Sequence, residues 1–180
     1  SSVLLRAAQE DTFSTHMRDV FMHQLAIKCF PTLLAQDYKY TVLYINGEYW
    51  GVYAFREAHS ADSYANHYGY DADTVTQYKE AWDSGSATEE LYNFMCNNRI
   101  SDNDENYAYV SSHIDVDSLI GWTILQAYCG NMDDNPPNFR MYYSSQDDMS
   151  RYALVDLDLG LFKMGNTYDV ALYSGYAYSL

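Results

Sequence analysis

The sequence predicts an α+β fold in two lobes. In the first third of the chain, apolar residues at helical spacing are followed by a clear β-hairpin. Farther along, a long apolar helix leads through a loop into two short strands, and a pair of aspartates follows the second strand. We therefore place a partial small lobe at residues 1–58 and a large lobe at residues 59–180.

The small lobe is expected to begin with a strand and a helix. Val3–Arg6 is a short apolar run typical of a strand. The segment 10–12 opens the expected helix, with Thr12 or Ser14 as its N-cap. The apolar face of this helix is predicted to consist of Phe13, Met17, Val20, Phe21 and Leu25.

The clearest hairpin of the sequence spans residues 40–55. Two β-rich runs, TVLYI and YWGVYAF, are joined by Asn46 and Gly47, a dipeptide that tolerates the positive φ angles of a type I′ turn. Arg56 and Glu57 follow the second strand directly. A charged pair at a strand end is most often a structural ion pair, and the alternative is a hinge that faces a ligand.

The first expected helix also carries a charged pair. Arg18 and Asp19 lie outside its apolar face. The sequence leaves open whether these two side chains face solvent or reach into a cleft.

The large lobe is expected to contain three helices and a second hairpin. The first two helices are predicted at residues 60–68 and 88–97, with loops over residues 69–88 and 101–106. The third begins at Asp115 or Asp117, ends at Gly130, and is apolar around so much of its circumference that we expect it to be buried. The strands of the second hairpin are predicted at residues 139–143 and 151–155.

Composition excludes several classes of function. The net charge is −15, so a nucleic acid or an anionic membrane surface is not expected as a partner, because both need basic patches. No run reaches the roughly 18 apolar residues of a membrane span, so no membrane insertion is expected. The three cysteines are widely spaced, which disfavours a zinc site and leaves the redox state open. An anionic ligand such as a nucleotide would need metal ions to bind such an acidic chain.

Four oxygen-bearing side chains between Gly130 and Gly160 carry the predicted chemistry. Asp133 follows the long helix, Asn138 comes five residues later, and Asp156 and Asp158 end the last strand. In protein kinases, an aspartate at this D-x-x-x-x-N spacing accepts the substrate proton, while the asparagine and a later strand-end aspartate bind magnesium. The pattern predicts phosphoryl transfer, with Asp133 as the catalytic residue and Asn138, Asp156 and Asp158 as ligands of Mg²⁺ or Mn²⁺.

Two other interpretations compete with this one. The run ALVDLDLG also matches the apolar strand and D-x-D motif of haloacid-dehalogenase-type phosphatases. That motif normally opens its domain, whereas only a short tail follows it here. The aspartates could also be no more than helix caps and turn residues.

The sequence resembles the spore-coat-protein-H (CotH) family of atypical protein kinases over nearly its whole length. The resemblance rests, in order, on LLRAAQEDTFSTHMRDVFMHQLA, VLYINGEYWGVYAFRE, GNMDDNPPNFRMYY and YALVDLDLGLF. It implies a two-lobed, protein-kinase-like fold and transfer of the γ-phosphoryl group of ATP to serine or threonine hydroxyls of a protein substrate. It also implies an extracellular, cell-surface or spore-coat location. Arg56 and Glu57 match the hairpin end that borders the nucleotide cleft.

The chain departs from the kinase pattern in its basic residues. None of the lysines lies on a strand before the first helix, where a phosphate-binding lysine is expected. We therefore expect an incomplete domain, with that lysine upstream of residue 1 and the C-terminal end also missing. The alternative is a catalytically inactive adhesion or scaffold module that keeps the fold.

Overall fold

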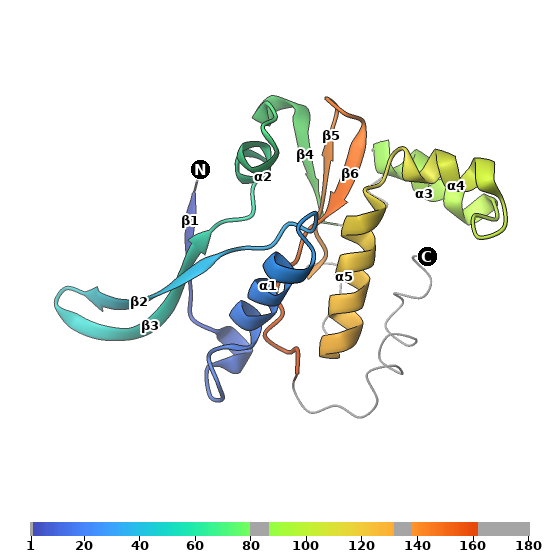
Figure 1. The fold of residues 1–180 in the computed structure, drawn as a ribbon. Helices are drawn as coiled ribbons and strands as arrows, with labels where there is room; N and C mark the ends of the chain where they lie inside the picture. Colours follow the sequence, from blue (N-terminus) through green and yellow to red (C-terminus); the bar gives the residue numbers. More distant parts are fainter. Residues whose placement is uncertain (1, 80–86, 132–137, 162–180) are drawn as a thin grey trace.

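The computed structural model describes residues 2–79, 87–131 and 138–161 (Figure 1). Within these ranges it is a mixed α+β structure with two three-stranded antiparallel sheets, so the predicted α+β class is confirmed. The helices and strands, in chain order, are β1 (Val3–Arg6), α1 (Arg18–Cys29), β2 (Tyr38–Ile45), β3 (Glu48–Glu57), α2 (Ala61–Tyr68), β4 (Val75–Tyr78), α3 (Ala87–Asn97), α4 (Asp104–Ser111), α5 (Val116–Cys129), β5 (Met141–Ser144) and β6 (Met149–Tyr152).

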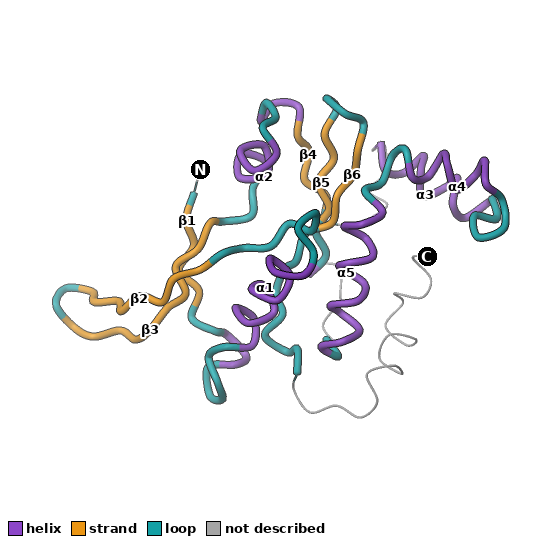
Figure 2. The backbone as a smooth tube through the Cα atoms, in the orientation of Figure 1, coloured by secondary structure: helices purple, strands orange, loops and turns teal. Residues whose placement is uncertain are grey.

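The first sheet has the strand order β1-β3-β2 and contains the predicted hairpin. Asn46 and Gly47 form its turn with φ angles of 53° and 87°, in the left-handed region that a type I′ turn requires. The far end of the hairpin extends away from the rest of the molecule (Figures 1 and 2). Its aromatic side chains Tyr44, Tyr49 and Trp50 are exposed there.

Helix α1 begins at Arg18, so the expected start near Thr12 is wrong. The buried carboxylate of Asp11 accepts hydrogen bonds from the backbone N–H groups of Thr15 (3.0 Å), Met17 (2.8 Å) and Arg18 (3.1 Å). These bonds hold the preceding segment in a loop around one side chain instead of a helical turn. Phe13, expected on the buried face, is 99% exposed as a result.

The second sheet has the order β4-β5-β6 and confirms the second predicted hairpin, although the bounds of its strands differ from the predicted ones by one to three residues. Strand β4 was expected to be a loop, and so was the start of α4, so the loop predictions at 69–88 and 101–106 are wrong in part. The expected helix after Ser60 is confirmed. Ser60 and Ser63 form a reciprocal capping box at its start.

Helix α5 begins and ends where the sequence predicts, with Asp115 as N-cap and Gly130 as a left-handed C-cap. It packs beside α1 (Figure 1), and a Cβ atom added at Gly121 would lie 2.9 Å from the ring of Phe30. One face of α5 enters the main core, as expected of a buried helix, but the opposite face is exposed, so the expected burial is confirmed only in part. The exposed apolar residues are Ile120, Ile124 and Tyr128.

The main core joins the two predicted lobes. Met22 and Ala26 of α1 pack in one cluster with Trp122 and Leu125 of α5 and with residues at the end of β6. The division between residues 58 and 59 stays a prediction. None of the helices in the described ranges is long and apolar enough to cross a membrane.

A buried polar cluster fixes the second sheet against α2. We call it the Arg151 centre. The guanidinium group of Arg151 donates hydrogen bonds to the Tyr64 hydroxyl (3.0 Å) and the Asp147 carboxylate (2.6 Å). It also lies over two aromatic rings, 5.0 Å from the centroid of Tyr68 and 5.6 Å from that of Tyr70. Arg151 is thus held by groups from two separate segments, α2 with the residues just after it and the turn between β5 and β6.

Candidate functional site

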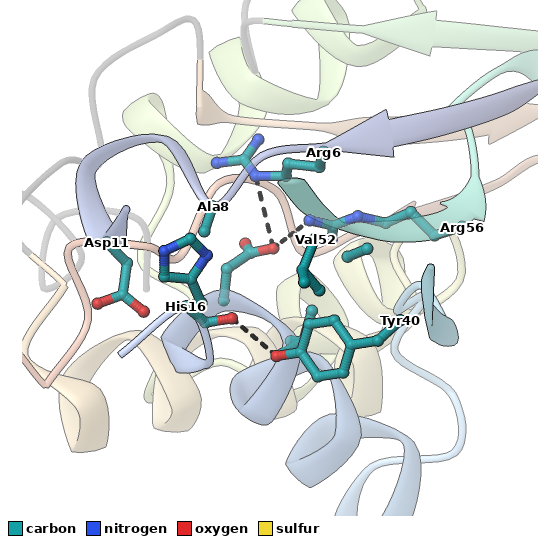
Figure 3. A pocket seen from close by; sticks show the side chains of 10 residues that line it. Arg6, Ala8, Asp11, His16, Tyr40, Val52 and Arg56 are labelled. Atoms are coloured by element: carbon teal, nitrogen blue, oxygen red, sulfur yellow. Dashed lines mark hydrogen bonds and ion pairs between the residues drawn. The ribbon is translucent and has the colours of Figure 1, made fainter. Parts of the chain in front are cut away.

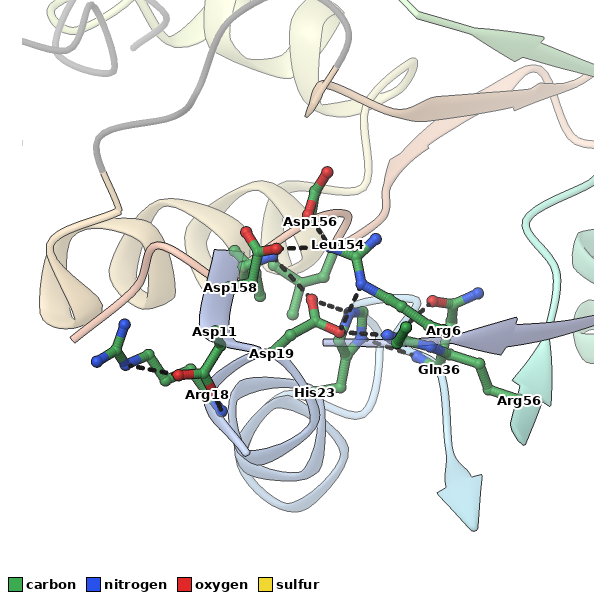
Figure 4. A network of polar contacts seen from close by, with 12 residues as sticks. Arg6, Asp11, Arg18, Asp19, His23, Gln36, Arg56, Leu154, Asp156 and Asp158 are labelled. Carbon is green, nitrogen blue, oxygen red and sulfur yellow. Dashed lines mark hydrogen bonds and ion pairs between the residues drawn. The ribbon is translucent and has the colours of Figure 1, made fainter. Parts of the chain in front are cut away.

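The two aspartates after β6 converge on one arginine from the other end of the chain. Arg6, the last residue of β1, donates from Nη2 to Asp156 Oδ1 and, at 3.2 Å, to Asp158 Oδ2 (Figure 4). The Asp158 side chain is only 2% exposed. Asp156 has a φ of 52°, a left-handed conformation that aspartate adopts more readily than most residues.

A third carboxylate, Asp19 of α1, lies beside this pair. It is 5% exposed, accepts the Leu157 N–H at 2.8 Å and forms a hydrogen-bonded ion pair with Arg56. Arg6 Nε lies 3.6 Å from Asp19. Burial alone would raise the pKa of Asp19, but the neighbouring His23, Arg56 and Arg6 side chains and the Leu157 amide hold it well below its usual range. Asp19 is therefore ionised at neutral pH.

We call this cluster the Asp19 centre: three carboxylates face two guanidinium groups in it. Its members are Arg6, Asp19, Arg56, Asp156 and Asp158. Burial raises the pKa of Asp156, and the nearby negative charge of Asp158 raises it further, whereas Arg6 lowers it; the net change is upward. The centre thus carries a surplus of negative charge beside Asp156.

Gln36, in the segment before β2, supports Arg56 together with His23 of α1. Gln36 accepts a hydrogen bond from Arg56 Nη1 at 3.1 Å and donates to the Glu57 carbonyl. The Gln36 backbone N–H donates to His23 Nδ1 at 3.0 Å, which places the imidazole proton on Nε2, 3.7 Å from Asp19. Arg56 is therefore fixed in orientation by partners on both sides.

Two pockets border the centre. The first is narrow and lies between the first sheet and α1, where Arg6, Asp19 and Arg56 share its wall with Tyr40 and His16 (Figure 3). The second, of about 360 Å³, lies at the end of β3, lined by residues 55–59 and by side chains of α2. Arg56 borders both pockets.

A comparison with family models decides which family this chain represents. The model described as "CotH kinase protein" matches residues 1–172. The chain belongs to the CotH kinase protein family. A comparison with curated proteins found no match.

Membership of a kinase family implies the use of ATP, and it confirms the resemblance seen in the sequence. All five residues of the Asp19 centre lie within the matched range. In this member of the family, charged groups from the first third of the matched segment meet two aspartates from near its end.

The structure places the predicted site residues unequally. Asp156 and Asp158 lie together, and Arg56 is joined to them through Asp19. Glu57 is exposed, while the adjacent Arg56 is buried. Asn138 is half-buried at the start of the segment that leads into β5. Asp133 lies outside the described residues, so its role as catalytic residue stays a prediction.

Sequence reasoning missed two members of the centre, Arg6 and Asp19. Arg6 lies on a strand before the first helix, where the kinase pattern predicts a phosphate-binding lysine. In the sequence, Asp19 is a charge outside the apolar face of the helix, and either a solvent-facing or an inward-facing side chain was possible. The structure buries this side chain. Its contact with Leu157 spans most of the chain and has no local sequence signal.

The donor set at Asp156 and Asp158 fits a divalent cation. Both carboxylates already approach a single nitrogen of Arg6, so their oxygens converge on one cationic point. Magnesium is commonly bound by one or two carboxylates, with water and substrate phosphates completing the shell. Within the described ranges, no group of three or more histidine, cysteine, aspartate or glutamate side chains could hold a metal. The fit therefore rests on a two-carboxylate site.

Proposed function

We propose that this CotH kinase transfers the γ-phosphoryl group of ATP to serine or threonine hydroxyls of a protein substrate. The observation that supports this most is the meeting of Arg6, Asp19, Asp156 and Asp158. In protein kinases, a basic residue on a strand pairs with an acid on the following helix, and both lie near the metal-binding aspartate after a later strand. Arg6 on β1, Asp19 on α1 and the aspartates after β6 have these relations. They support a two-lobed, kinase-like fold.

Each proposed role follows from the chemistry of the side chain. Asp133 would orient the substrate hydroxyl and accept its proton. Asp156 and Asp158, with Asn138, would hold Mg²⁺ or Mn²⁺. The bound metal would neutralise charge on the ATP phosphates as the phosphoryl group moves.

Basic groups at the site would complete the binding of ATP. Arg6 would contact the phosphates in place of the expected lysine, because its guanidinium group already lies beside Asp156 and Asp158 and suits phosphate oxygens. Arg56 and Glu57 would border the nucleotide at the 360 Å³ pocket. Since the whole chain has a net charge of −15, a polyphosphate needs both the metal and Arg6 to overcome repulsion.

Family resemblance also supports an extracellular, cell-surface or spore-coat location. A protein substrate there would present serine or threonine to Asp133. A catalytically inactive scaffold with the same fold is the alternative, and it would bind neither the metal nor the nucleotide at these residues.

Calorimetry of the 180-residue chain with Mn²⁺ and the ATP analogue AMP-PNP tests this proposal. We expect metal-dependent binding that is lost in Asp156→Ala and retained in Asp102→Ala, a control whose carboxylate pairs with Arg99 on the surface. Asp133→Asn should bind nucleotide but lose phosphate transfer from ATP, with an unchanged circular dichroism spectrum. Equal binding by wild type and Asp156→Ala would show that the metal site is elsewhere.

A further inference from the structure

Arg6 contacts the two metal-ligand candidates through the same nitrogen atom. Nη2 reaches both Asp156 Oδ1 and Asp158 Oδ2, while Nε faces Asp19 at 3.6 Å, too far for a hydrogen bond. Nε is buried and has no hydrogen-bond partner in the described part of the chain. The guanidinium group is thus drawn toward the two strand-end carboxylates while one of its own donors is left without an acceptor.

We propose that Arg6 and a divalent cation compete for the carboxylates of Asp156 and Asp158, so that metal binding releases Arg6 to the phosphates of the nucleotide. This inference rests on the proposed function, because it takes the metal and nucleotide to bind at this centre. It adds an order of events. The metal first displaces Arg6 from the two carboxylates, and the phosphates of the nucleotide then contact both the metal and Arg6.

Competition follows from the shared oxygen atoms. A cation bound between Asp156 and Asp158 would meet the positive charge of Arg6 on the same side of both carboxylates. Two positive groups cannot occupy one position, and a doubly charged ion compensates the buried Asp158 and the partly buried Asp156 better than one guanidinium group. The guanidinium group of Arg6 therefore has to move away from both carboxylates when the metal binds.

The remaining contacts of the centre keep the free-energy cost of releasing Arg6 low. Asp19 keeps its ion pair with Arg56 and its hydrogen bond from the Leu157 N–H when Arg6 leaves. No buried carboxylate is left without a partner, which is the situation that makes breaking an ion pair costly. Arg56 is fixed by Gln36 and Asp19, so it is the permanent counter-charge and Arg6 the exchangeable one.

The competition predicts opposite effects of one substitution on two affinities. Arg6→Met keeps the length and packing of the side chain but removes its charge. Without the competing guanidinium group, Mn²⁺ alone should bind about tenfold more tightly, since a charge-assisted contact no longer has to be broken. With Mn²⁺ saturating, AMP-PNP should bind about tenfold more weakly, because the phosphates lose a cationic partner.

Arg18→Met is the matched control, since it removes one positive charge from a nearby arginine that pairs with Asp11 instead. Free Mn²⁺ is measured by electron paramagnetic resonance during titration of wild type, Arg6→Met and Arg18→Met without nucleotide, and AMP-PNP binding is then measured by calorimetry. Tighter Mn²⁺ binding and weaker AMP-PNP binding in Arg6→Met alone support the exchange.

Two results overturn the inference and are distinguishable. If wild type binds Mn²⁺ at Asp156 and Arg6→Met binds it equally or more weakly, the exchange is wrong and the proposed function stands. If none of the proteins binds Mn²⁺, including Arg6→Met with its spectrum and thermal transition intact, the metal site and the proposed function fail together.

Discussion

The Asp19 centre and the Arg151 centre both join arginine to aspartate across distant segments, but they use the guanidinium group differently. Arg151 reaches oxygen atoms of three different residues, including Asp115 at 3.5 Å, and two tyrosine rings cover its face. In the Asp19 centre, one nitrogen of Arg6 serves two carboxylates and another has no acceptor in the described residues. Arg151 is thus divided among three residues that do not share an atom of the guanidinium group, whereas one nitrogen of Arg6 is shared by two carboxylates.

The largest effect is expected from removing the carboxylate that both arginines of the Asp19 centre share. Asp19→Ala should lower the free energy of unfolding by about 3–5 kcal/mol, because it leaves Arg56 buried without its ion-pair partner. Urea denaturation measures this loss. Asp102→Ala, which breaks a surface pair, should cost about 0.5 kcal/mol or less. Similar values for the two variants would mean that Asp19 is not a structural anchor.

Arg151→Met tests whether the second centre is structural only. It leaves the buried Tyr64 hydroxyl without its donor, whereas the partly exposed Asp147 carboxylate keeps the hydrogen bond from Tyr70, so the free energy of unfolding should fall by about 1–2 kcal/mol. The affinity for Mn²⁺ should not change. Urea denaturation and the Mn²⁺ titration give the two numbers, and an altered Mn²⁺ affinity would break the contrast between the centres.

Acid should weaken the protein through the histidines around the Asp19 centre. Burial lowers the pKa of His23 to about 4 and that of His59 to about 3, whereas an unfolded histidine titrates near about 6.5. Their folded pKa values are depressed, so the unfolded chain takes up protons first as the pH falls. Stability is therefore complete above pH 6.5 and declines below it, at up to about 1 kcal/mol per pH unit for each histidine.

Urea denaturation at pH 7, 6 and 5 measures this slope. His59→Gln keeps a donor for the Leu154 carbonyl, which His59 Nε2 reaches at 2.8 Å, and should flatten the decline by about half. His67→Gln, at an exposed position on α2, should leave it unchanged. A slope that is the same in all three proteins would show that the buried histidines do not control acid stability.

The elements that the sequence predicts correctly carry their signals locally. Asn46-Gly47 specifies the hairpin turn, and Asp115 and Gly130 mark the ends of α5 within a few residues. The start of α1 was missed because Asp11 binds three backbone amides that lie after it in the chain, and these bonds replace a helical turn. Strand β4 was missed because four residues carry little pattern, and its pairing with β5 is a tertiary contact.

The residues of the candidate site also divide into those with a local sequence signal and those without one. Asp156 and Asp158 could be predicted because an apolar strand followed by D-x-D is a compact motif. Arg6 and Asp19 join them only when β1 and α1 pack against the chain after β6, and no spacing in the sequence encodes that contact. The interior position of Arg56 also depends on this packing, since its partner Asp19 lies 37 residues away.

The hydrogen bond from Leu157 to Asp19 has a consequence in coordination chemistry. Leu157 stands between the two candidate ligands, and its N–H belongs to the rigid peptide plane that begins at Asp156. By holding that plane, α1 fixes the backbone between Asp156 and Asp158. If these two carboxylates bind a metal as proposed, the packing of a helix that supplies no ligand would set their separation and so influence which ionic radius fits.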